Sequence, residues 1–178
     1  LADSYIHALA AEWDLICKKH NLVDPVIKTV FFGGGTPSLL PSHLWKTIMQ
    51  TLFSRLNLHD SVEWTIECNP ESFTTEKAAV YADSGVNRLT FGIQSVHDRE
   101  LSLLGRKHSA QRAMDVLNDP VLESFQSVGA DLMFGFPGQT LLSFEKSLNT
   151  VLQSPHIKHL SAYELITEPG TVFGRHRK

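Results

Sequence analysis

Residues 28–40 read Lys28-Thr29-Val30-Phe31-Phe32-Gly33-Gly34-Gly35-Thr36-Pro37-Ser38-Leu39-Leu40, and this stretch decides the fold. Its apolar, β-branched and aromatic residues predict a buried strand that ends at three glycines. Glycine allows a sharp turn or the close approach of a ligand, so the triplet suits either a tight turn or a binding loop. Pro37 and Pro41 then favour the first turn of a helix. A strand, a bare main-chain loop and a helix form the arrangement in which α/β proteins keep their ligands.

Strand-type and helix-type segments alternate along the rest of the chain. Further strands are predicted over 62–67, 88–93, 127–135 and 159–165. Helices are predicted over residues 2–20, about 41–56, 74–83, 109–117 and 140–152, and a further helix is predicted to start at residue 98. Thr74 and Ser109 are predicted to cap two of these helices. Such alternation is typical of βαβ crossovers and a parallel sheet, here part of a (β/α) barrel. A doubly wound open sheet is the alternative, because alternation alone does not say whether the sheet closes.

Composition limits the partners and the setting. The 178 residues suffice for one domain, and the net charge of −3 with a pI near 6.3 gives no general attraction to nucleic acid or to an anionic membrane. No apolar run approaches the length of a membrane span. Cys17 and Cys68 have neither disulfide-framework nor zinc-site spacing, which favours a reducing, cytoplasmic setting. We expect the chain to be an internal piece of a longer protein.

Polar residues stand at or near the end of strand after strand. Glu67 ends the second predicted strand, Gln94 follows the third, and Asp131 lies within the fourth among apolar neighbours. Taken singly, Glu67 could cap a helix and Gln94 could be an ordinary strand-end residue, whereas a carboxylate such as Asp131 in apolar surroundings needs donors or a cation. Because parallel strands gather their carboxyl ends at one edge, we expect these groups and the glycine loop to converge on a polar ligand with hydroxyl or amino groups.

Common phosphate and metal motifs do not fit this sequence. The glycines lead into Thr36-Pro37 without the lysine of a P-loop, and Ser38 occupies the last glycine position of GxGxxG. The nine histidines show no HxH or HExxH spacing, and no Gly-x-Ser-x-Gly nucleophile elbow occurs. The polar edge therefore calls for a different kind of ligand.

Six blocks occur in the order found in a known family. They are Val30–Leu40, Ile66-Glu67-Cys68-Asn69-Pro70, Gly85–Ser95, Leu103-Leu104-Gly105-Arg106-Lys107-His108, Asp131–Thr140 and Glu168-Pro169-Gly170-Thr171. From Thr29 to Phe173 the chain resembles radical S-adenosylmethionine (SAM) proteins of the oxygen-independent coproporphyrinogen III oxidase family. Gln94-Ser95 and Leu104-Gly105-Arg106-x-His108 resemble the HemW-like haem chaperone branch more than the oxidase.

The resemblance implies a partial (β/α)6 TIM-type barrel of the radical SAM kind that lacks its first strand and cluster loop. It also implies cofactor contacts, residue by residue. The main chain of Gly34, Gly35 and Thr36 would receive the methionine amino group of SAM, and Arg106 would pair with its carboxylate. Ile166 would line the adenine through its backbone. Glu67, Gln94 and Asp131 would contact the ribose of SAM and its neighbouring polar atoms.

One departure from the family concerns the [4Fe–4S] cluster. The CxxxCxxC motif that holds the cluster is absent from residues 1–178, and Cys17 and Cys68 lack its spacing. We expect residues 1–178 to be a fragment of a radical SAM core domain, with the cluster motif and a C-terminal domain outside it. The fragment alone is expected to bind no cluster and to cleave no SAM reductively.

Three functions are compatible with these observations. The leading hypothesis is the SAM-binding barrel of a HemW-like protein that binds haem and passes it to an acceptor protein. The alternative is the oxidase itself, acting on a porphyrin by radical decarboxylation. A second alternative is a β/α-barrel enzyme that binds a phosphorylated metabolite on the glycine loop, although no basic residue stands beside the glycines.

Overall fold

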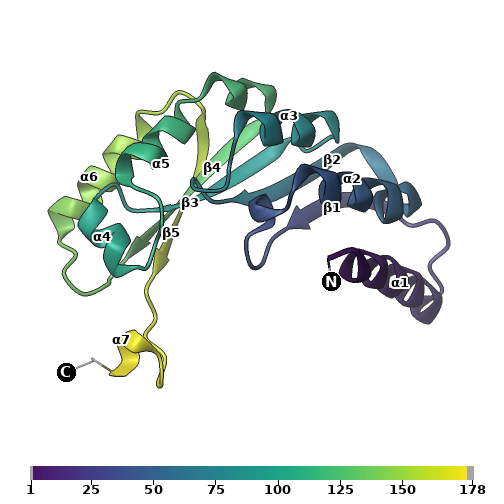
Figure 1. Cartoon of the computed structure of the whole chain (residues 1–178), viewed down its shortest axis with the longest axis horizontal. Coiled ribbons are helices and arrows are strands. Elements are labelled where there is room, and N and C mark those ends of the chain that lie inside the picture. Colours follow the sequence, from purple (N-terminus) through teal and green to yellow (C-terminus); the bar gives the residue numbers. More distant parts are fainter. Residues whose placement is uncertain (1, 176–178) are drawn as a thin grey trace.

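The computed structural model describes residues 2–175 and contains a parallel sheet with helices on its outer face (Figure 1). The strands are β1 (Val26–Phe32), β2 (Asn57–Cys68), β3 (Arg88–Gln94), β4 (Ser127–Phe134) and β5 (Ile157–Glu164). The helices are α1 (Ala2–His20), α2 (Ser42–Thr51), α3 (Thr75–Asp83), α4 (Asp98–Leu103), α5 (Ala110–Leu117), α6 (Leu141–Leu152) and α7 (Val172–Arg175). Short 3₁₀ turns cover Pro37–Leu39, Phe53–Arg55 and Pro120–Ser124.

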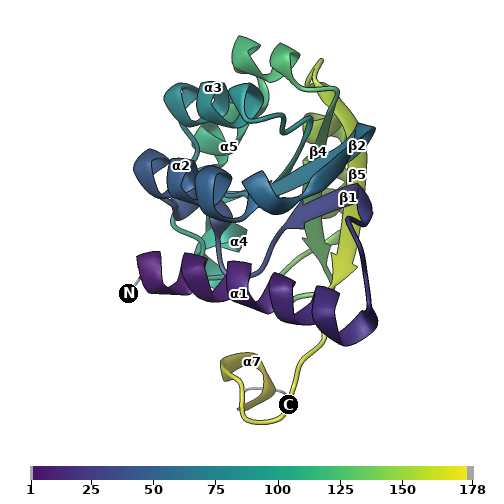
Figure 2. The same ribbon diagram turned by 90° about the vertical axis from the view of Figure 1, so that its right-hand side faces the viewer.

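The strand order distinguishes a barrel from a doubly wound sheet. The order is β1-β2-β3-β4-β5, and every neighbouring pair is parallel. A doubly wound sheet reverses its order at a switch point, whereas this sheet advances in one direction. Figure 1 shows the sheet curving beneath α2, α3, α5 and α6, and Figure 2 shows α1 beside α2 at the β1 end. The partial barrel is confirmed, and the doubly wound alternative is wrong.

Most predicted element boundaries hold, because local capping chemistry fixes them. The side chains of Thr74 and Ser109 accept hydrogen bonds from main-chain N–H groups in the first turns of α3 and α5, as predicted. Thr140 caps α6 in a reciprocal capping box with Ser143. Gly85, after α3, has φ +97°, the left-handed conformation expected of a C-terminal cap.

Two boundaries differ from the sequence-based prediction by about five residues, more than the others do. Helix α2 ends at Thr51 instead of continuing to about residue 56, and Phe53 lies in a 3₁₀ turn where its ring stacks on Trp64 at a centroid distance of 4.2 Å. Strand β2 begins at Asn57, five residues before the predicted start at Val62, because it pairs with Val26 at the start of β1. Tertiary packing and strand pairing override the local pattern in both cases.

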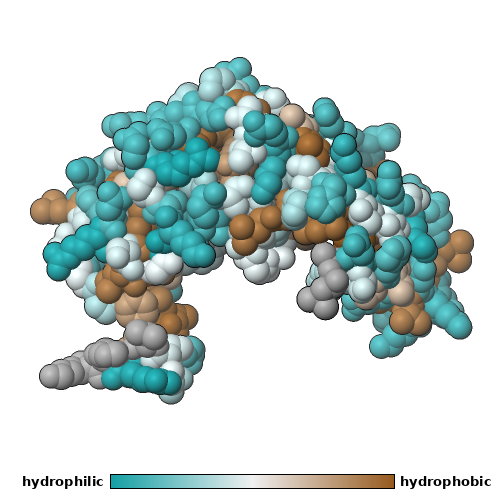
Figure 3. All heavy atoms as spheres, viewed as in Figure 1, coloured by the Kyte–Doolittle hydropathy of each residue, from teal (hydrophilic) through white to brown (hydrophobic). Residues whose placement is uncertain are grey.

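The two faces of the sheet differ sharply in chemistry. On β3, Leu89, Phe91 and Ile93 are buried in the core beneath the helices, and the alternating residues project to the concave face. The helical side is mostly hydrophilic in Figure 3, with apolar side chains gathered along the lower rim. None of the helices within residues 2–175 combines the length and apolar character needed to cross a bilayer.

Candidate functional site: a polar pocket at the carboxyl edge of the sheet

The glycine loop after β1 leaves its main chain bare. Gly34 and Gly35 have φ of +75° and +48°, and a Cβ added to either would have no neighbour within 4 Å. Gly33 is exposed, but a Cβ added to it would lie 2.5 Å from Phe31 Cε1 and 3.0 Å from Glu67 Cδ. The N–H of Gly34 donates to Glu67 Oε2 over 3.1 Å. The loop after β1 and the carboxylate at the end of β2 therefore form one unit.

Asn69 ties the same loop to the segment after β2. Its Nδ2 donates to Thr36 Oγ1 over 3.1 Å, and its main-chain N–H donates to Ser38 Oγ over 3.0 Å. Lys77 on α3 adds a second connection by donating to the carbonyls of Ser38 and Ser72. These bonds fix the position of the glycine loop relative to β2.

Gln94 ends β3 in an unusual conformation. Its φ is +69°, which is uncommon for a residue with a side chain, and the pairing of β3 with β4 shifts register between Gly92 and Gln94. A Cβ added to Gly92 would lie 2.8 Å from Asn69 Oδ1, 3.0 Å from Gln94 Nε2 and 3.9 Å from Arg106 Nη1. Three polar side chains from three segments thus meet above a residue that has no side chain.

Arg106 lies in the loop after α4. Its main-chain N–H donates to Leu101 O, and Gly105 before it has φ +68°, so the helix ends in a tight left-handed turn. Within residues 2–175, no carboxylate lies within ion-pairing distance of its guanidinium. A planar cation that faces a polar pocket in this way is suited to a carboxylate of a ligand.

Asp131 supplies a second carboxylate, from the middle of β4. Burial raises its pKa above the ordinary value, while hydrogen bonds with Ser161 and Thr90 and the nearby His159 and Arg88 oppose the rise. Asp131 pairs in register with Gly92 on one side and Ser161 on the other. The carboxylate is therefore half-buried on the concave face, next to the floor of the pocket.

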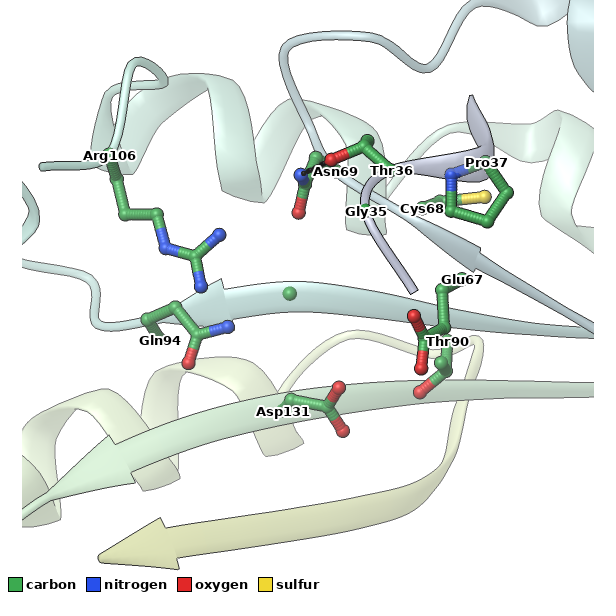
Figure 4. A pocket seen from close by; sticks show the side chains of 11 residues that line it. Gly35, Thr36, Pro37, Glu67, Cys68, Asn69, Thr90, Gln94, Arg106 and Asp131 are labelled. Atoms are coloured by element: carbon green, nitrogen blue, oxygen red, sulfur yellow. Dashed lines mark hydrogen bonds between the residues drawn. The ribbon is translucent and has the colours of Figure 1, made fainter. Parts of the chain in front are cut away.

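These groups line one polar pocket of about 210 Å³ (Figure 4). Figure 4 shows the side chains of Arg106 and Gln94 at one end of the pocket and those of Glu67 and Asp131 at the other. Its lining comprises Gly35, Thr36, Pro37, Glu67, Cys68, Asn69, Thr90, Gly92, Gln94, Arg106 and Asp131. The volume is below the roughly 300–1,000 Å³ of typical ligand sites, so it accommodates part of a nucleotide-sized molecule.

The structure brings together most of the residues selected from the sequence. Six of the eight line the pocket, and Gly34 touches it through its bond to Glu67. Ile166 lies apart from this lining, in the segment after β5, and is 74% exposed. Sequence reasoning missed Thr90 and Gly92, whose only signal is their place on the same face of β3 as Gln94.

The chemistry of the pocket matches a ligand that carries both charges. The two carboxylates can accept hydrogen bonds from hydroxyl and amino groups, and the two amides can both accept and donate. The guanidinium is available for an anionic group of the ligand. Among residues 2–175 there is no group of three or more His, Cys, Asp or Glu side chains that could hold a metal ion. Burial raises the pKa of the Cys68 thiol well above its ordinary value, so that cysteine is a poor thiolate ligand.

Comparison with known proteins gives the same picture. The chain is 38% identical over 172 residues to the haem chaperone HemW of Bacillus subtilis, covering 96% of this chain and 45% of that protein. It is 36% identical over 173 residues to HemW of Mycobacterium tuberculosis, covering 97% of this chain and 44% of that protein. The chain thus spans less than half the length of these relatives.

Structural similarity leads to the same family. The solved structure of the Escherichia coli coproporphyrinogen III oxidase HemN, described as a radical SAM enzyme, superposes with a TM-score of 0.83 at 26% identity. That match covers 99% of this chain and 40% of HemN. The profile of the Radical SAM superfamily matches residues 10–151, which include the glycine loop and all of the pocket. The chain belongs to the radical SAM superfamily.

Proposed function

We propose that this chain is the SAM-binding barrel segment of a HemW-like haem chaperone. The observation that carries the proposal is the convergence of an available guanidinium, two carboxylates and a bare glycine loop on one pocket. SAM carries an amino group, a carboxylate and ribose hydroxyls, which match those groups in kind. Superfamily membership implies SAM and a [4Fe–4S] cluster as cofactors of the protein.

Each of the eight residues selected from the sequence has a proposed task. Arg106 holds the carboxylate of SAM, and the main chain of Gly34, Gly35 and Thr36 receives its amino group. Glu67 and Asp131 accept hydrogen bonds from hydroxyls, and Gln94 contacts polar atoms between the two ends. Ile166 contacts the adenine through its backbone, which requires the segment after β5 to lie over the mouth.

The described residues fit SAM but do not fit the iron–sulfur cluster. Cys17 lies on α1 and Cys68 is buried at the end of β2, and they do not form a three-thiolate site. We therefore place the cluster ligands outside residues 1–178 and assign no redox step to this chain. Two free thiols without a disulfide are consistent with a cytoplasmic protein.

An apolar groove supports the proposal that this segment is part of a larger barrel. The groove has a volume of about 730 Å³ and lies between α1, α2 and β1, and β1 pairs within the described sheet with β2 alone. Phe31, on this edge strand, is 61% exposed. Such an edge invites further strand pairing, and we propose that the rest of the barrel covers it.

The Gln94-Ser95 pair and the Arg106-x-His108 segment resemble the HemW-like branch more than the oxidase, and this resemblance is the reason for proposing the chaperone. Ser95 is fully buried, donates to Glu100 Oε2 over 2.6 Å and accepts from the N–H of His97. This side chain therefore sets the start of α4, the helix that leads to Arg106. In the proposed chaperone, haem and a haem-acceptor protein are the partners.

Two measurements on the full-length protein test the proposal. Calorimetry should detect SAM binding and no comparable binding of a sugar phosphate; the reverse result would favour the phosphorylated-metabolite alternative. Haem titration followed by transfer to an apo-haemoprotein should show binding and release. Anaerobic conversion of coproporphyrinogen III to protoporphyrinogen IX without haem binding would assign the oxidase instead.

A further inference from the structure

His108 is a buried side chain that the proposed function does not use. The whole residue is 5% exposed and its side chain 0%, and both of its ring nitrogens have partners. Its Nδ1 lies 3.1 Å from Glu71 Oε2, and its Nε2 lies 3.2 Å from the carbonyl oxygen of Ile93. The ring therefore bridges the Glu71 side chain and the main chain near the end of β3.

The two bonds of His108 connect the segments that carry pocket residues. Ile93 directly precedes Gln94, whose φ of +69° places its amide over the pocket. Glu71 stands two residues after Asn69, and His108 itself stands two residues after Arg106. One ring thus joins the ends of β2 and β3 to the loop after α4.

The loop that carries Arg106 needs such an anchor. Its helix-side half is fixed by main-chain bonds from Leu104, Gly105 and Arg106 back to α4. Lys107 is exposed, and the chain enters α5 after Ser109. On the far side of Arg106, His108 is the first buried side chain, with 0% of its side chain exposed. The N–H of Ala110 also ties this side of the loop to Asp98 Oδ1 on α4 over 2.7 Å, but His108 lies nearer to Arg106 in the sequence.

We propose that His108, together with Glu71, is a positioning residue that fixes the Arg106 guanidinium over Gly92 for the carboxylate of SAM. This inference rests on the proposed function, since it concerns how the same pocket recognises its ligand. Partners that orient a ligand-contacting group typically contribute about 10–100-fold to affinity in metal sites, and we expect the lower end of that range here. His108 does not contact the ligand, so its effect passes through Arg106.

Decarboxylated SAM, which lacks the carboxylate that Arg106 would bind, distinguishes the positioning of Arg106 from general stabilisation of the fold. Dissociation constants for SAM and for decarboxylated SAM are measured by equilibrium dialysis on the full-length, cluster-loaded protein. His108→Ala and Glu71→Ala should each weaken SAM about tenfold and change decarboxylated SAM less than about twofold. Glu71 is partly exposed, so its variant preserves the buried ring if His108→Ala fails to fold.

Controls and a double variant complete the test. His43→Ala and Glu145→Ala, both exposed, should leave both constants unchanged. Combining Glu71→Ala with Arg106→Ala should cost no more than Arg106→Ala alone, because both remove the same interaction. Equal losses for the two ligands, or additive losses in the double variant, would overturn the inference. If the wild-type protein binds no SAM, the proposed function itself fails, and the wild-type measurement alone shows this failure.

Discussion

Gly92 is the floor of the pocket, and a methyl group added there tests the geometry of the site. Gly92 is absent from the residues with positive φ, so Gly92→Ala meets no backbone restriction. The new Cβ would lie 2.8 Å from Asn69 Oδ1 and 3.0 Å from Gln94 Nε2, against the ~3.5–4.0 Å of comfortable contact. Both neighbours are ends of flexible side chains, which can move. The expected change is a rearranged pocket in an intact fold.

The displacements give the magnitude of the effect. Moving each amide off its preferred geometry costs about 0.5–1.5 kcal/mol, so two of them cost about 1–3 kcal/mol in the bound state. At 1.4 kcal/mol per factor of ten, SAM affinity should fall roughly 5–150-fold. Folding stability should change by less than about 1 kcal/mol, because replacing glycine reduces the entropy of the unfolded chain.

Equilibrium dialysis with SAM and thermal unfolding of the same samples measure the two quantities. Gly129→Ala is a graded control on the neighbouring strand. Its Cβ would meet Thr90 Oγ1 at 3.0 Å, but neither Gln94 nor Arg106, so a smaller loss of affinity is expected. Unchanged SAM affinity in Gly92→Ala would refute the placement of the ligand above Gly92.

Three further predictions concern charged groups. Arg106→Ala should weaken SAM about 10–150-fold, since a hydrogen bond to a charged group contributes about 1.5–3 kcal/mol, whereas Lys107→Ala should have no effect in the same dialysis assay; equal losses would argue against the ion pair. Asp131→Asn should raise the melting temperature at pH 7, because the folded-state pKa of Asp131 is raised and the stability from its protonated form is lost as pH rises through that pKa. The gain should shrink as pH falls through the raised folded-state pKa of Asp131 and should be absent below the ordinary value of 3.8; a variant that is less stable at pH 7 would contradict this sign. Lys77→Met removes the ammonium group that donates to the carbonyls of Ser38 and Ser72, and it should destabilise the fold by about 1–3 kcal/mol in urea unfolding; an unchanged midpoint would show that these bonds do not hold the glycine loop.

The order of strands and helices could be predicted because the signals are local. Thr74 and Ser109 cap their helices through bonds within the first turn, which do not depend on the rest of the fold. The consecutive β/α units left open mainly whether the sheet forms part of a barrel or is doubly wound. Phe53 shows the limit of this reasoning. Its helical spacing is genuine, but stacking on Trp64 places it outside α2, and that contact depends on a strand later in the chain.

The candidate site was predictable to the same degree. Glu67, Gln94 and Asp131 were recognisable because unusual polar residues at the ends of parallel strands converge on one edge. Gly92 and Thr90 were not recognisable, since a glycine or threonine within a strand gives no signal until register places it beside Asp131 or Glu67. The anchoring bonds of His108 depend on two segments distant in sequence and required coordinates.

A crystal structure of the full-length protein with SAM tests the central claim most directly. We expect the SAM carboxylate to lie on the Arg106 guanidinium and the ribose of SAM to lie between Glu67 and Asp131, above Gly92. Electron density for SAM away from this carboxyl edge, with Glu67, Gln94 and Asp131 making no contact to it, would contradict the account.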